Sequence, residues 1–362
     1  MKEIKYALEN ARAFEPDLNE VQLMGVDMFI EKPKVKTIPL IKNFLDSQTI
    51  TLIGGDTGVG KSWVGLQMAL CLASGKDFMN HFKTEMQKVI YAQFEMTDYQ
   101  VEKRMKLLFN HFDEQQMESI RKNLFMMQKG NAFDDQWKRI RDIISNETLE
   151  GSVLIVDNLY TSLPTSIDIS KNVDAGKAMK TIAQLQSDFD LSVSLLCHHT
   201  KGVSDRAITK DDILGCATLS RYASNIFQMK KSVLSNEYKI GKLTKVRDED
   251  CHLEEVPVKL KFTDGYFTMS QIITNEVVHY QGLEERWEIK IVREIWDRQK
   301  LEEWDRAYLR KFLQAEGWKA DKHLETKITR LINKWNDWGL LNKDYNRFSL
   351  KHSELFENDA SL

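Results

Sequence analysis

Hydrophobic positions in the first 200 residues alternate between short apolar runs and longer stretches with helical spacing. The apolar or β-branched runs, each bounded by polar or turn residues, predict buried strands over residues 50–53, 88–94, 152–157 and 191–197. Helical periodicity covers about residues 63–72, 99–112, 135–145 and 173–189. A capping box over residues 97–100 is expected to open the second of these helices. Strands that alternate with helices predict an α/β fold with a doubly wound, mainly parallel sheet.

The pattern changes in the second half of the chain. A polar loop (200–211) and a short helix (213–222) precede four predicted strands, at residues 225–229, 238–246, 256–262 and 266–269. Residues 281–352 hold six of the eight tryptophans, and their spacing predicts helices over 284–298, 304–316 and 322–338, then a hairpin over 340–350. Three helices and a hairpin are typical of a winged helix. We therefore expect a lead-in (1–44), a sheet domain (45–275), a winged-helix-like domain (284–352) and an acidic tail (353–362).

The first predicted strand runs straight into a glycine-rich turn and then into a helix. Gly55, Gly60, Lys61 and Ser62 satisfy the phosphate-loop pattern G-x-x-x-x-G-K-[ST]. Glycines let main-chain N–H groups surround a triphosphate, and the helix N-terminus adds its positive dipole end. The stretch predicted to bind nucleotide is Gly55, Asp56, Thr57, Gly58, Val59, Gly60, Lys61, Ser62 and Trp63.

Carboxylates follow two of the predicted strands. In this interpretation Lys61 reaches the β- and γ-phosphates, while Ser62 and Asp157 hold Mg²⁺. Glu95 is the candidate to orient or deprotonate the attacking water. The bland alternatives are a solvated aspartate at a strand end and a helix N-terminal glutamate favoured by the dipole.

Two histidines, His198 and His199, close the strand over residues 191–197. One of them, preferably His198, is a candidate sensor that donates a hydrogen bond to the γ-phosphate; a structural role is the alternative. A metal pair is disfavoured because adjacent strand side chains point to opposite faces.

Several cations are candidates for contacts outside the phosphate loop. Lys245 and Arg247 share one side of a predicted strand and suit a pair that reaches a neighbouring subunit's γ-phosphate, with Arg221 as a second candidate. All three also fit a solvated basic face. The loop 200–211 carries Lys201, Arg206 and Lys210 but no aromatic residue, and it is one candidate for contacting a nucleic-acid backbone. The loop 161–172 is the other.

Composition narrows the class of protein only moderately. The 362 residues are 42% hydrophobic and 29% charged with net charge −3, as in an ordinary soluble protein. No apolar run is long enough to cross a bilayer, the start lacks an apolar signal core, and the four separated cysteines predict reduced thiols, so we expect a cytoplasmic protein. Residues 209–215 resemble GTPase motifs but occur in the wrong order, which favours ATP over GTP.

The ordered set of motifs resembles the RecA-like ATPases, and most closely plasmid RepA-type hexameric helicases and AAA-type ATPases of mobile elements. The resemblance rests on the phosphate loop, Glu95, the strand ending in Asp157, the two histidines, and Lys245 with Arg247, and it covers about residues 35–270. It implies a homo-oligomer, usually a hexamer, with ATP at each interface and Arg221 or Arg247 supplied by the next subunit.

These observations lead to an ATP-hydrolysing motor that acts on DNA, single-stranded at the ATPase core, as a helicase of a plasmid or mobile element. A nucleotide-switched DNA-binding regulator without unwinding activity is the alternative. A metabolite kinase lacks any acceptor-binding motif. In the winged-helix-like domain, which binds DNA or protein, the cations available for phosphates are Lys322, Lys327, Arg330, Lys334, Lys343 and Arg347. Its tryptophans are expected to form core rather than base-stacking surfaces.

Overall fold

A computed structural model of the chain describes residues 25–31, 37–127, 135–200, 206–233, 237–247, 251–273, 276, 278–281, 291, 294–295, 303–320, 323–337, 341–344 and 347–350. The residues up to Thr37 form a unit apart from the rest, and in it the structure describes one helix, α2 (Val26–Glu31). The chain from Ile38 onward holds all the elements that follow.

Within the described residues, the fold is built on one nine-stranded sheet in the order β11-β10-β9-β8-β3-β7-β6-β4-β5. The six strands from β8 to β5 are parallel to their neighbours, and β9, β10 and β11 continue the sheet antiparallel. The strands are β3 (Ile50–Gly55), β4 (Val89–Gln93), β5 (Leu124–Met127), β6 (Val153–Asp157), β7 (Ser192–His198), β8 (Asn225–Lys231), β9 (Tyr238–Lys245), β10 (Pro257–Thr263) and β11 (Tyr266–Ile272). The expected α/β fold with a mainly parallel sheet is confirmed.

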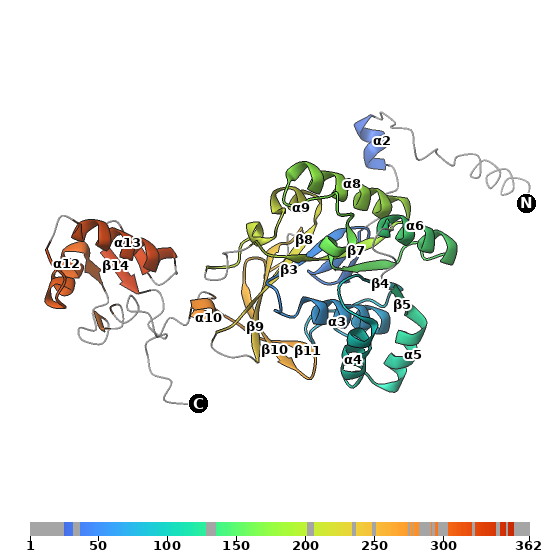
Figure 1. The fold of residues 1–362 in the computed structure, drawn as a ribbon, viewed down its shortest axis with the longest axis horizontal. Coiled ribbons are helices and arrows are strands. Elements are labelled where there is room, and N and C mark those ends of the chain that lie inside the picture. Colours follow the sequence, from blue (N-terminus) through green and yellow to red (C-terminus); the bar gives the residue numbers. More distant parts are fainter. Residues whose placement is uncertain are drawn as a thin grey trace, which may run out of the picture. The chain divides into compact units, whose positions relative to one another are not determined.

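Helices cover both faces of this sheet, as Figure 1 shows. One face carries α3 (Lys61–Ser74), α4 (Asp98–Phe109) and α5 (Glu114–Asn123), and the other carries α6 (Gln136–Glu147), α8 (Asn172–Asp188) and α9 (Cys216–Tyr222). Short turns of helix follow β6, precede α9 and follow β11; they are α7 (Leu159–Ser162), η1 (Lys210–Asp212) and α10 (Val278–Gln281). Each helix layer packs on its own hydrophobic cluster.

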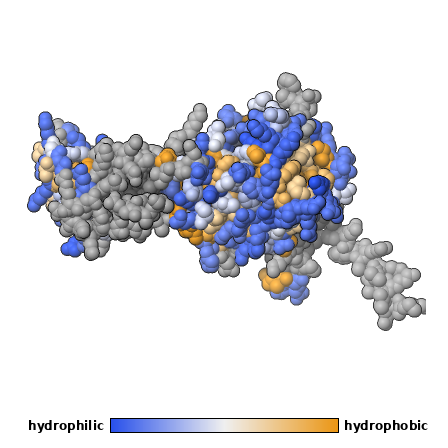
Figure 2. All heavy atoms as spheres, turned by 90° about the horizontal axis from the view of Figure 1, so that it is seen from below, coloured by the Kyte–Doolittle hydropathy of each residue, from blue (hydrophilic) through white to orange (hydrophobic). Residues whose placement is uncertain are grey.

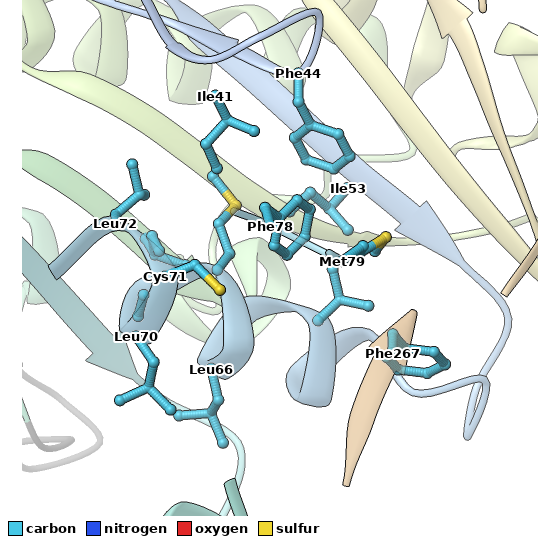
Figure 3. Close-up of a cluster of buried hydrophobic side chains, with 14 of the residues drawn as sticks. Ile41, Phe44, Ile53, Leu66, Leu70, Cys71, Leu72, Phe78, Met79 and Phe267 are labelled. Carbon is cyan, nitrogen blue, oxygen red and sulfur yellow. The ribbon is translucent and has the colours of Figure 1, made fainter. Parts of the chain in front are cut away.

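The helix that follows the phosphate loop is buried along nearly its whole length. Leu66, Leu70 and Leu72 of α3 lie in one cluster with residues from β3 and β11 (Figure 3). The Gln67 amide donates to the Phe267 carbonyl at 2.8 Å and accepts from the Phe267 N–H at 2.8 Å, so α3 is fixed to β11 by polar contacts as well. Burial on all sides explains why α3 has no polar face, since strand β11 covers the side that would otherwise meet water.

The capping box predicted for residues 97–100 is present. The Thr97 hydroxyl accepts from the Gln100 N–H at 3.4 Å, and the Gln100 side chain accepts from the Thr97 N–H at 3.0 Å. These bonds satisfy N–H groups that the first turn of α4 would leave without partners. They fix where α4 begins, three residues after Glu95.

Three expectations about local structure were wrong. The lead-in was expected to be helical up to its end, but β1 (Pro39–Ile41) and β2 (Leu45–Asp46) form an antiparallel hairpin, with Asn43 at the positive φ of a tight turn. Residues 114–123 were not expected to be helical, yet a second capping box, from Asp113 to Gln116, opens α5 there. Trp304 and Asp305 were expected in a helix but form β12.

The C-terminal elements consist of two helices and a small antiparallel sheet of order β12-β14-β13. They are β12 (Trp304–Asp305), α12 (Arg306–Ala315), α13 (Leu324–Asp337), β13 (Leu341–Asp344) and β14 (Arg347–Leu350). Trp304 and Trp335 are buried and meet edge to face with ring centroids 5.9 Å apart, which confirms for these two the expected core role. Most of the helix expected over residues 284–298, Lys322 and the acidic tail lie outside the described residues.

The surface seen in Figure 2 is largely hydrophilic, with hydrophobic areas scattered between charged ones. No helix in the described part of the chain is long and apolar enough to cross a membrane.

Candidate nucleotide-binding site

The predicted phosphate loop connects the carboxyl end of β3 to the first turn of α3. Gly58 and Gly60 have φ values of 71° and 111°, which side-chain-bearing residues rarely adopt. A Cβ at Gly60 would also lie 2.9 Å from the Phe267 ring. The sequence needs glycine at both places, because the loop turns through left-handed backbone while strand β11 packs against it.

A pocket opens over this loop. Its lining residues come from the phosphate loop, from α3 and α4, and from the ends of β4 and β7; they are Thr57, Gly58, Gly60, Lys61, Ser62, Trp63, Glu95, Met96, Arg104 and His198. Parallel strands deliver their carboxyl ends to one edge of a sheet, and ligands of such sheets bind there. The structure thus brings together six of the nine residues predicted to bind nucleotide with Glu95 and His198.

The ammonium group of Lys61 is buried within the loop. Its Nζ donates to the carbonyl oxygens of Gly55 at 2.8 Å and Asp56 at 3.0 Å, and it lies 3.3 Å from Nδ1 of His198. Burial lowers the pKa of Lys61, while the nearby carboxylates of Glu95 and Asp157 act in the opposite direction. The loop therefore holds a cation at its centre on weak, neutral acceptors that an anionic phosphate can replace.

Asp157 ends β6 almost completely buried. Its Oδ2 accepts from the Tyr91 hydroxyl at 2.8 Å, whereas its Oδ1 is buried without a hydrogen-bond partner among the described residues. Burial raises the pKa of Asp157, and the hydroxyl groups of Tyr91 and Ser62 act against that rise. A buried carboxylate oxygen without a partner and close to a serine hydroxyl fits the donor set that Mg²⁺ prefers. Ser62 and Asp157 therefore suit the predicted metal role.

A chain of side chains joins the two predicted catalytic positions. The Asn158 amide donates to the Glu95 carboxylate and lies 3.3 Å from Nε2 of His198, whose other ring nitrogen faces Lys61. Burial and the charge of Lys61 lower the pKa of His198, so its ring is neutral at pH 7. We call Lys61, His198, Asn158 and Glu95 the pocket network. It places a carboxylate, an amide, an imidazole and an ammonium group around one opening.

The comparisons with known proteins agree with this geometry. A family model described as an AAA domain matches residues 19–204, just over half of the chain. The chain belongs to the AAA domain family. This AAA domain is a P-loop ATPase domain, which supports ATP and Mg²⁺ as its ligands.

Solved structures with similar folds cover most of their own length. One of them, whose title describes it as an ATPase domain, is 16% identical, covers 62% of this chain and 86% of its own, and has a TM-score of 0.45. A KaiC-like protein from the archaeon Pyrococcus horikoshii OT3 is 12% identical, covers 64% of this chain and 94% of its own, with a TM-score of 0.46. The search of curated proteins finds no match.

Two pocket residues of this AAA domain were not anticipated from the sequence. Asn158 follows Asp157 directly, and Arg104 on α4 lies with its guanidinium 4.9 Å from the centre of the Trp63 ring. Arg104 stands nine residues after Glu95, and only the position of α4 against α3 brings it into the pocket. The one available signal for Asn158 was its place immediately after a strand-end carboxylate.

The two predicted histidines have different surroundings. His198 lines the pocket, while the side chain of His199 is 1% exposed and its Nδ1 lies 3.0 Å from Oδ1 of Asp56. Alternation along the strand separates them, as expected for consecutive residues. His199 thus contacts the phosphate loop from beneath rather than from the pocket.

The structure does not bring Lys245, Arg247 or Arg221 to the phosphate loop. Strand β9 runs antiparallel to β8, and Lys245 pairs with Ile226 at the opposite edge of the sheet. The Lys245 ammonium donates to the carbonyls of Ser220 and Ala223 at the end of α9, at 2.7 and 2.6 Å. Arg247 is exposed, and Arg221 is exposed beside a second pocket between α8 and α9. Within one chain, then, none of these cations reaches the γ-phosphate position.

The loop over residues 200–211 is described only in part, and Lys201 lies outside the described residues. Arg206 is exposed, and its guanidinium forms an ion pair with Asp212 at 2.6 Å. Lys210 is exposed at the start of the short helix η1.

Proposed function

We propose that the protein is an oligomeric RecA-like ATPase that hydrolyses ATP and uses the energy to act on DNA, as a helicase of a plasmid or mobile element. The observation that carries the proposal is the pocket network, because it sets a carboxylate opposite the lysine of a phosphate loop. A binding-only pocket has no need of a carboxylate held in that place.

Each residue of the pocket has a task in the proposed hydrolysis. Lys61 leaves its carbonyl partners and contacts the β- and γ-phosphates, while Ser62 and Asp157 would hold Mg²⁺. When bound, Mg²⁺ neutralises charge that develops on the phosphate oxygens. Glu95 orients the attacking water and accepts its proton. Asn158 keeps the Glu95 carboxylate in place and contacts His198 on its other side.

His198 is proposed to report the state of the γ-phosphate. Its Nδ1 faces Lys61, and its Nε2 faces the amide that holds Glu95. A movement of either partner after cleavage therefore changes the hydrogen bonds of the ring. His198 also precedes the loop 200–211, so a shift of this residue reaches the proposed DNA-contacting segment directly.

Oligomerisation enters the proposal through the cations at the far edge of the sheet. Arg247 and Arg221 are exposed and cannot serve the phosphate loop of their own chain. In a ring, an exposed arginine of one subunit can complete the site of the next one, where it stabilises charge on the γ-phosphate. Lys245 is proposed to support this arginine through its contacts with α9 rather than to touch nucleotide.

DNA contacts are proposed for the exposed cations of the loop 200–211 and for the C-terminal elements, proposed to be a winged helix. Lys327 and Arg330 are exposed on α13, the proposed recognition helix. Arg347 on β14 forms an ion pair with Glu303 at 3.0 Å, which occupies its guanidinium in the absence of a phosphate. The second candidate function, a DNA-binding regulator switched by ATP, uses the same contacts without strand separation.

The deciding experiment measures the ATPase rate with and without single-stranded DNA, together with the mass in solution and unwinding of a forked duplex. The proposal expects an oligomer whose ATPase rate rises with DNA and which separates the strands. Stimulation without strand separation would support the regulator. A monomer with a DNA-independent ATPase rate would contradict both.

A further inference from the structure

His199 lies directly beneath the phosphate loop and is held there by two kinds of bond. Its Nδ1 is 3.0 Å from Oδ1 of Asp56, the second residue of the loop, and its N–H donates to the Gly55 carbonyl at 3.2 Å. The imidazole is buried, and its Nε2 has no hydrogen-bond partner among the described residues. All polar contacts of this side chain are therefore directed at the start of the loop.

The same residue is tied to a segment that follows the loop 200–211. His199 pairs with Ile213 in an antiparallel bridge, the Leu214 N–H donates to the His198 carbonyl at 3.0 Å, and the Thr200 N–H donates to the Asp212 carbonyl at 2.8 Å. Residues 212–214 thus form a short ladder with residues 198–200. A displacement of His199 changes the phosphate loop and this ladder together.

Asp56 brings a negative charge into a loop that receives an anion. Although burial acts to raise its pKa, the hydrogen bond and charge of His199, with the charges of Lys230 and Lys61, lower it. The carboxylate is therefore ionised at neutral pH, and its side chain is 30% exposed. Without the bond to His199 it would be free to turn toward an entering triphosphate, which it repels.

We propose that His199 is a positioning residue: through Asp56 it keeps this carboxylate away from bound nucleotide, and through its ladder it transmits occupancy of the phosphate loop to residues 212–214. This inference rests on the proposed nucleotide site. It assigns His199 a role in nucleotide affinity and signal transfer, whereas His198 faces the γ-phosphate.

The first test titrates a fluorescent, non-hydrolysable ATP analogue with Mg²⁺ into full-length variants. His199→Leu, which removes the hydrogen-bond donor, is expected to weaken binding about tenfold. His199→Asn places an amide nitrogen near the position of Nδ1 and should recover most of the affinity. Asp56→Asn in the His199→Leu background should also recover it, because the repelling charge is gone. His81→Leu, which changes an exposed histidine, is the control and should bind as the wild type does.

Rescue by Asp56→Asn separates this role from simple packing. If His199 only fills space, the double variant binds as weakly as His199→Leu, and the inference is overturned. If the wild type does not bind the analogue at all, the proposed nucleotide site itself fails. If the wild type and His199→Leu bind equally well, only the inference about His199 fails.

The second test follows hydrogen exchange of the backbone amides of Thr200 and Leu214, which donate within the ladder. In the wild type, saturation with the analogue is expected to change their exchange rates. In Asp56→Asn, which alters a partly exposed side chain and should fold, nucleotide still binds but the change is expected to be at most half as large. An equal change in Asp56→Asn would overturn the proposed transfer.

Discussion

Two groups of charged side chains flank the phosphate strand β3, and they solve the problem of burial in opposite ways. On the side of β7, the pocket network ends in groups without full partners, such as the lysine held by carbonyls and the nearby Asp157 Oδ1. On the side of β8 and β9, a second group closes on itself. We call this group, which consists of Lys230, Asp212, Lys242, Glu276 and Tyr280, the buried network.

The buried network pairs each charge with an opposite one. Lys230 lies 3.2 Å from Asp212 and donates to the Arg206 carbonyl at 2.8 Å, while Lys242 lies 3.0 Å from Glu276. Glu276 also accepts from the Tyr280 hydroxyl at 3.0 Å. A paired charge in the interior stabilises one arrangement of the chain and leaves little capacity for a ligand. Incomplete pairing beside an opening is the feature that indicates chemistry.

Lys61 and Lys230 make the comparison sharp, because burial lowers the pKa of both. Lys230 has a carboxylate partner, and Lys61 has only main-chain carbonyls and an imidazole. The same residue type is therefore expected to serve catalysis on one side of β3 and stability on the other.

The largest effect is expected for Lys61→Ala. It should lower the ATPase rate by at least about a hundredfold, because the phosphates lose their central cation. The free energy of unfolding should change by no more than about 1 kcal/mol, since only bonds to carbonyls are lost. Steady-state ATPase rates and urea unfolding of the same preparation measure both. A loss of stability as large as that of a buried ion-pair variant would remove the distinction between the two networks.

Lys230→Met should act in the opposite sense. It leaves Asp212 buried with only Arg206 as a cationic partner, so unfolding should become easier by about 3 kcal/mol. Under conditions where the variant is folded, its ATPase rate should stay within a few-fold of the wild type. The double variant Lys230→Met with Asp212→Asn is the matched control, and it should regain part of the lost stability. A Lys230→Met protein as stable as the wild type would show that this pair is not needed.

A smaller effect concerns pH and His279, which contacts Ser232 next to the buried network at 3.0 Å. Burial, with the charge of Lys259, lowers the pKa of His279 to about 4. Below pH 6.5 the unfolded chain binds a proton that the folded chain refuses, so stability present above pH 6.5 is lost as the pH falls toward about 4. With allowance for partial exposure, the loss should be about 2 kcal/mol larger in the wild type than in His279→Gln. Urea unfolding at several pH values tests this, and parallel pH profiles would contradict it.

The smallest effect is expected for an exposed ion pair. Lys83 and Asp77 lie 2.6 Å apart with side chains 78% and 36% exposed. Lys83→Ala should change the free energy of unfolding by less than about 0.5 kcal/mol. A loss comparable to that of Lys230→Met would mean that pairing, rather than burial, determines the cost.

Much of the sheet and the phosphate loop could be predicted because their signals are local. An apolar run that ends in Asp157 or His198 specifies a buried strand and its terminal residue. The exceptions depended on tertiary contacts. Arg104 reaches the pocket through the packing of α4. The direction of β9, which puts Lys245 at the far edge, follows from its pairing with β8, and no single stretch of sequence records that pairing.

Local turn chemistry explains other differences between prediction and structure. The apolar spacing of residues 304–316 is helical, but Asp305 caps α12 by accepting from the Tyr308 N–H at 2.7 Å. The helix therefore begins at Arg306, and Trp304 pairs with Phe348 in the sheet. An N-cap aspartate was visible in the sequence, whereas the strand pairing was not.

The account depends most directly on Glu95, because the pocket network surrounds this carboxylate. The decisive measurement compares the ATPase rate and the bound ATP of the wild type and Glu95→Gln under identical conditions. The account predicts that the variant retains ATP binding while turnover slows by at least about a hundredfold. Normal turnover by Glu95→Gln would contradict it.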